Sequence, residues 1–99
     1  MADLDIAVAQ LGAPLGQLAL NATAKEVAAT VSGRVNALVE FAAYDSNGDS
    51  VPFLYSNAAA GTFNRVQGGV IRLPVVNAQS WYFKQDQSVA PQLQANCVG

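Results

Sequence analysis

The clearest pattern in this chain is an alternation of apolar and polar positions between residues 31 and 44. Its odd positions are all apolar or small, and they are Val31, Gly33, Val35, Ala37, Val39, Phe41 and Ala43. Polar residues stand at the even positions Ser32, Arg34, Asn36 and Glu40. Since successive side chains of a strand point to opposite faces, this period of two predicts one strand with one face in a core. Leu38 and Tyr44 place apolar groups on the other face.

Further short strands are predicted along the rest of the chain, at a spacing of roughly ten residues. In residues 70–76 the apolar side chains alternate, and Pro74, which lacks a ladder donor, places that strand at a sheet edge or bulge. Farther along, Trp81 and Phe83 point to one face and Tyr82 to the other. Strands of this length and spacing predict an all-β fold, a small antiparallel β-sandwich or barrel.

The first residues differ from the rest. Leu4, Ile6 and Val8 alternate, and Gly and Pro residues then interrupt the pattern between positions 12 and 16. We therefore expect residues 1–16 to form an extended N-terminal arm and residues 17–99 a single β-domain. Two interpretations of the arm stay open, a frayed terminus or a strand that docks onto a neighbour.

Residues 45–49, Asp-Ser-Asn-Gly-Asp, predict a turn, because Asn-Gly is the strongest short-range signal for a hairpin. The three acidic and amide residues also have the spacing of the first ligands of an EF-hand calcium loop. However, Ser50 and Ser56 stand where that loop needs Gly and a bidentate Glu. We therefore predict turn chemistry there and no metal site.

The closing segment, residues 85–99, is polar and interrupted by Pro91, and we expect it to lie along the surface. It contains Cys97, which is the chain's single cysteine, so an internal disulfide is excluded. We interpret Cys97 as an incidental thiol near a flexible end, since the chain has no histidine to activate it.

Composition points to contact rather than catalysis. Charged residues make up 12% of the chain, about half the usual share, and hydrophobic residues 52%. Interface cores are depleted in charge, so this balance favours an oligomer or assembly component. The net charge of −2 and scattered basic residues argue against nucleic acid, and no apolar run is long enough for a membrane span. The acidic start is unlike a secretory signal.

No constellation of catalytic residues, cofactor ligands or metal ligands stands out. Histidine is absent, and Gly48-Asp-Ser-Val-Pro52 lacks the final Gly and the histidine partner of a nucleophile elbow. One interpretation of the aromatic residues is carbohydrate binding, in which a sugar ring stacks on Trp81, Tyr82, Tyr55 or Tyr44. In the other interpretation Trp81 and Phe83 form the core, which leaves Tyr44 and Tyr82 facing outward for a sugar or a protein partner.

Taken together, the acidic start, the Ala-, Val-, Asn- and Gln-rich body, the turn at 45–49 and the pairing of residues 69–75 with 81–84 resemble small virion proteins of tailed bacteriophages. Within that group the chain is similar to capsid decoration, or cement, proteins. The resemblance implies a non-enzymatic oligomer, commonly a trimer, that binds the major coat protein on the capsid exterior of the virion after synthesis in the host cytoplasm. A tail or fibre component and a carbohydrate-binding adhesion module are the alternatives.

Two groups of residues are predicted to make partner contacts in such a protein. Leu4, Ile6 and Val8 of the arm would supply coat contact by adding a strand or filling a groove. Leu38, Tyr44 and Tyr82 would form a self-association patch, because the alternation turns them outward.

Overall fold

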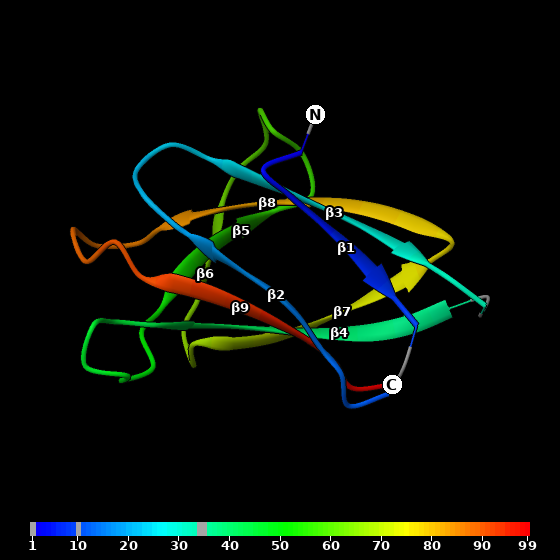
Figure 1. Ribbon diagram of the computed structural model, residues 1–99. Helices are drawn as coiled ribbons and strands as arrows, with labels where there is room; N and C mark the ends of the chain where they lie inside the picture. Colours follow the sequence, from blue (N-terminus) through cyan, green and yellow to red (C-terminus); the bar gives the residue numbers. More distant parts are fainter. Residues whose placement is uncertain (1, 10, 34–35) are drawn as a thin grey trace.

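Two β-sheets pack face to face in the computed structural model, which describes residues 2–9, 11–33 and 36–99 (Figure 1). Sheet A has the strand order β1-β3-β8-β5-β6, and sheet B has the order β2-β9-β4-β7. The described residues contain no helix, and their strands are β1 (Leu4–Val8), β2 (Pro14–Ala19), β3 (Lys25–Val31), β4 (Asn36–Tyr44), β5 (Phe53–Ser56), β6 (Asn64–Val66), β7 (Val70–Val76), β8 (Ala78–Gln85) and β9 (Gln92–Cys97). The predicted all-β fold is confirmed, in its sandwich form.

Neighbouring strands in both sheets run antiparallel, except for β1 and β3. These two are parallel, with Leu4 opposite Val27 and Val8 opposite Val31. Between them the chain crosses to sheet B as β2 and then returns, so β3 re-enters sheet A in the direction of β1 (Figure 1). A crossover of this kind is what a parallel pair requires.

An aromatic cluster fills the space between the sheets. Phe41 of sheet B meets Trp81 of sheet A edge to face, with ring centroids 5.2 Å apart at 71°, and Phe83 at 4.8 Å. Phe53 adds a contact with Phe83 at 5.9 Å. All four side chains are buried. The prediction that Trp81 and Phe83 belong to the core is therefore confirmed.

The alternation between residues 31 and 44 correctly predicts the inward face of β4. The prediction that these residues form one single strand is wrong. Ala37, Val39, Phe41 and Ala43 are buried as predicted. Val31, however, is the last residue of β3, and the chain then turns at Gly33, whose φ of 75° lies in the left-handed region that favours glycine. Gly33 is a small residue at an odd position, so it fits the alternation of a strand even though the chain turns there. Arg34 and Val35 lie outside the described residues.

The segment predicted to be an arm is instead part of both sheets. Ile6 and Val8 of β1 are 3% and 0% exposed, and they join the core beneath sheet A. After a turn, β2 pairs with β9 in sheet B. The alternation at residues 4–8 thus fills the domain's own core, because Ile6 and Val8 point inward from β1 while Asp5 and Ala7 are exposed. Met1 and Gln10 lie outside the described residues.

The C-terminal segment also differs from the prediction. Residues 92–97 form β9, which lies between β2 and β4 in the middle of sheet B. Leu93, Ala95 and Cys97 are buried. The Cys97 thiol is therefore a core group and not a group at a flexible end.

The turn at residues 45–49 forms as predicted and closes a short hairpin, in which Tyr44 and Ser50 form an antiparallel bridge and the Val51 N–H donates to the Ala43 carbonyl at 3.0 Å. The Gly48 N–H donates to the Asp45 carbonyl at 3.0 Å, and the Asp45 carboxylate accepts from the N–H groups of Asn47 and Asp49 at 2.9 Å. The carboxylate thus serves the turn itself. Beyond it the chain leaves sheet B for sheet A, so β4 and β5 do not pair.

Replacing Ile6 by Ala tests whether the N-terminal segment belongs to the core. The change should lower the free energy of unfolding by about 2–5 kcal/mol, because it leaves a cavity under β1. Urea denaturation measures this loss. Asp5→Ala on the exposed side of the same strand is the control, and it should stay within about 0.5 kcal/mol of the parent. A detachable arm would instead give two small, equal effects.

Candidate functional site: the outer face of sheet B

The outward side chains of sheet B form a surface that we call the B face. It follows from the alternation of buried and outward residues along β2, β9, β4 and β7. Strand registers place Gln94 of β9 between Gln17 of β2 and Ala42 of β4, and Asn96 between Pro14 and Glu40. The other outward residues are Ala19, Asn36, Leu38, Tyr44, Val70, Arg72, Pro74, Val76 and Gln92.

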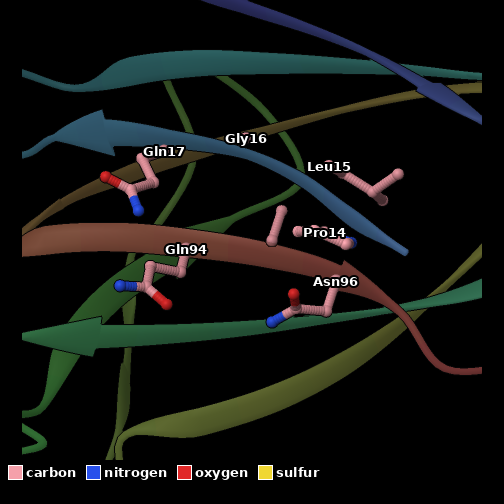
Figure 2. Close-up of a pocket in the computed structure, with 7 residues that line it drawn as sticks. Pro14, Leu15, Gly16, Gln17, Gln94 and Asn96 are labelled. Carbon is pink, nitrogen blue, oxygen red and sulfur yellow. The ribbon is translucent and has the colours of Figure 1, made fainter. Parts of the chain in front are cut away.

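A shallow hollow of about 320 Å³ lies on this face between β2 and β9 (Figure 2). The β2–β9 register shifts between Pro14 and Gly16, which marks a bulge, and bulges re-aim side chains beside functional sites. The lining of the hollow carries side-chain amides and no charged group. It consists of Pro14, Leu15, Gly16, Gln17, Gln94, Ala95 and Asn96.

The amides at the hollow are available to a ligand. Figure 2 shows Gln17 beside Gln94, with Asn96 farther along β9 near Pro14. Within the described residues, the side-chain amides of Gln17, Gln94 and Asn96 form no hydrogen bond. Each amide offers both donors and an acceptor, so the group suits a neutral polar surface or ligand.

Charge is nearly absent from the B face. Among the described residues its charges are Arg72 and Glu40, joined by an ion pair at 3.0 Å. The outer face of sheet A differs, since it carries Asp5, Glu26 and Lys84. Removing water from a neutral surface costs less than removing it from unpaired charges. The B face is therefore the better contact surface of the two.

A loop also covers part of the outer face of sheet A. The ring of Phe63 lies over the outward side chain of Lys84, with its centroid 4.4 Å from Nζ. Ser56, which pairs with Tyr82 on the same face, is 4% exposed. Tyr82 is thus half-buried beside this covered region.

The structure corrects both predicted groups of contact residues. Ile6 and Val8 are core residues, and Leu4 is half-buried against the core, so this strand does not present them to a coat protein. Leu38 and Tyr44 do share the B face on β4. Tyr82 lies on β8 in the other sheet, where outward side chains point the opposite way, so the three residues form no common patch.

Of the four aromatic residues considered for sugar stacking, two are directed inward. Trp81 is in the core, and Tyr55 packs beside Phe83 with ring centroids 5.9 Å apart. Burial raises the pKa of Tyr55, whose hydroxyl donates to the side chain of Asn57. Tyr44 and Tyr82 are half-buried and outward, on opposite faces.

The prediction that residues 85–99 lie along the surface hides the residues at the centre of the B face, because residues 92–97 form the strand β9. Gln92, Gln94 and Asn96 alternate with buried Leu93, Ala95 and Cys97. This period of two was the signal that could have found them. The described residues hold no cluster of three or more His, Cys, Asp or Glu side chains that could bind a metal ion.

Comparisons with known proteins leave the family open. Neither the known protein families nor the curated proteins include a match to this sequence. Among solved structures, the pre-peptidase C-terminal domain of a collagenase from Bacillus anthracis is similar over 94% of this chain and 93% of that chain, at 7% identity and a TM-score of 0.49. A search of the described residues for a helix long and apolar enough to cross a membrane found none.

Gly16→Ala tests the bulge beneath the hollow. Gly16 has a φ of 155°, and an added Cβ would lie 3.3 Å from Cδ1 of Leu4 on β1. The substitution should therefore destabilise the fold by about 1–3 kcal/mol. Thermal or urea denaturation measures the effect. Gly68→Ala, where an added Cβ meets nothing within 4 Å, is the matched control and should be nearly neutral. Equal effects at the two positions would contradict the assignment of strain to the bulge.

Proposed function

We propose that this chain is a non-enzymatic contact module that docks through the B face onto a protein surface. In its most specific form, the proposal is a capsid decoration protein that attaches as an oligomer to the coat lattice of a tailed bacteriophage. The observation that carries the contact role is the nearly uncharged B face with its unpaired amides. The phage setting is supported by the resemblance in composition and strand layout.

The physical case rests on the balance between desolvation and new hydrogen bonds. Apolar groups such as Leu38 and Pro74 gain from burial, at about 25 cal/mol per Å². The amides of Gln17 and Gln94 can exchange water for partner donors and acceptors at small net cost. Attachment at several points of a repeating lattice would then multiply the strength of a modest single contact.

A second function, carbohydrate binding, is favoured by one observation. The hollow brings together three amides without charge, and Tyr44 lies in the row beside Gln92 on the same face. Amides suit sugar hydroxyls, and an outward tyrosine can stack on a sugar ring. A glycan array would separate the two functions. Binding of a neutral glycan that is lost in Tyr44→Ala would favour the carbohydrate function over the coat contact.

Gln94→Glu tests the contact role at the centre of the B face. The nearly isosteric carboxylate would have to be desolvated without a partner, so affinity for purified virus particles should fall about tenfold or more, which is about 1.4 kcal/mol. Cosedimentation with particles of the encoding virus measures this. Thr30→Glu on the exposed outer face of sheet A adds the same charge and should bind like the parent. Unchanged binding by Gln94→Glu, or an equal loss in both variants, would contradict the proposal.

The copy number per particle separates decoration from a tail role. A copy number of the same order as that of the coat protein would support decoration. A small fixed number, measured by quantitative mass spectrometry of purified particles, would instead indicate a tail or fibre component. Absence from the particles would contradict both.

A further inference from the structure

Strand β7 forms one edge of sheet B, and no strand of the described residues lies beside the outer side of its backbone. The Leu38 N–H donates to the Gly99 carbonyl at 3.2 Å, and the Leu38 carbonyl accepts from the Val98 N–H at 2.9 Å. Both backbone groups of Leu38 thus point away from β7. In an antiparallel ladder, its opposite residue Pro74 then points its own backbone groups away from β4.

The same orientation applies to every second residue of β7. Along with Pro74, the backbone groups of Val70, Arg72 and Val76 therefore face the free edge. The side chains of these residues lie on the B face. Val70 is 45% exposed and Val76 is 63% exposed, which places them among the most exposed large hydrophobic residues that the structure describes.

We propose that β7 pairs antiparallel with β7 of a second copy of this chain, about a two-fold axis that passes between their Leu73 residues. This register sets Val70 opposite the partner's Val76, and Arg72 opposite the partner's Pro74. Val70 and the Val76 of the other copy can exchange two backbone hydrogen bonds. The Arg72 N–H of each copy can donate to the Pro74 carbonyl of the other copy. The only bonds lost are those that the two prolines cannot donate.

The two neighbouring symmetric registers are less favourable, each for its own reason. A two-fold axis at Arg72 would set the two arginines opposite each other and bring Val76 against the turn at Gly68. An axis at Pro74 would oppose two carbonyls with no donor between them. Arg72 and Pro74 together therefore favour the register that also brings the exposed valines together, and Arg72 keeps its ion pair with Glu40 in it.

The dimer deepens the proposed function. Its biological role rests on that proposed function. Antiparallel pairing about an axis perpendicular to the sheet turns both B faces to the same side. The dimer would present two hollows to one flat lattice and gain from bivalent attachment. A two-fold dimer would replace the trimer that the resemblance to decoration proteins implies.

The interface is small, and this sets the concentration at which it must be tested. A strand of seven residues is about 23 Å long, so an edge contact buries less than the roughly 800 Å² per partner of a standard interface. We expect a dimer with a dissociation constant in the micromolar range or weaker. Sedimentation velocity should therefore extend to submillimolar protein.

The test uses the purified chain in solution and one matched pair of charge variants. The parent should shift from monomer to dimer as concentration rises. Val76→Lys should weaken the dimer about tenfold or more, since it sets a cation beside the partner's Val70. Val89→Lys, at an exposed loop residue outside the strands, should dimerise like the parent. A parent that stays monomeric at submillimolar concentration, or equal weakening by both variants, would overturn the proposal.

Cysteine cross-linking tests the register. Opposed residues of a hydrogen-bonded pair have Cα atoms about 5.5 Å apart, which a disulfide can span. The double variant Val70→Cys/Val76→Cys should therefore form disulfide-linked dimers on mild oxidation. Arg72→Cys should not, because its opposite residue is the partner's Pro74. Efficient dimers from Arg72→Cys alone would overturn this register.

These outcomes are independent of coat binding. Dimerisation without attachment to virus particles would contradict only the proposed function. Attachment by a protein that stays monomeric in solution and forms no cross-link would contradict only the dimer.

Discussion

The contact of Phe41 with Trp81 and Phe83 holds the two sheets together, and the rest of the structure depends on it. Such aromatic pairs contribute about 0.5–1.5 kcal/mol each beyond the burial of their area. The chain repeatedly crosses from one sheet to the other, so strands that follow each other in sequence often lie in different layers. The layers are therefore held by core packing as well as by the turns that join them.

This arrangement separates stability from surface chemistry. Inward residues of β4 and β9 supply the core, while outward residues of the same strands form the B face. Because side chains alternate strictly along a strand, one sequence can meet both demands at neighbouring positions. The low charge content of the chain is visible on the B face, where the charged residues that the structure describes are Arg72 and Glu40, joined in one ion pair. A surface of this kind fits contact with a neutral partner better than steering of a charged one.

Local patterns predicted those strands whose own alternation is regular. The inward phase of β4, the inward Trp81 and Phe83 of β8, and the edge position that Pro74 indicates for β7 agree with the structure. These features depend on side-chain periodicity and on the missing proline donor, both of which are local. The all-β sandwich follows from them.

The turn at Gly33 is hidden by a local ambiguity, whereas the other errors arise because strand partners are set by distant residues. Nothing near residues 92–97 says that β2 and β4 will flank them, and nothing near Leu4 says that β3 will pair with it. The alternation of residues 92–97 is a local signal for a strand, but the place of that strand beside β2, which brings Gln94 next to Gln17, is set by the distant partner. The predicted patch of Leu38, Tyr44 and Tyr82 is wrong because the phase of side chains along a strand does not reveal which sheet the strand joins.

The central claim is that the B face, and not the outer face of sheet A, is the surface of contact. Tyr44 and Tyr82 are half-buried tyrosines on these two opposite faces, so they serve as paired reporters. Hydroxyl-radical labelling, read by mass spectrometry, should be compared for the free protein and for protein bound to purified virus particles. The account predicts that binding protects Tyr44 and leaves the labelling of Tyr82 unchanged. Protection of Tyr82 with Tyr44 still labelled would contradict it.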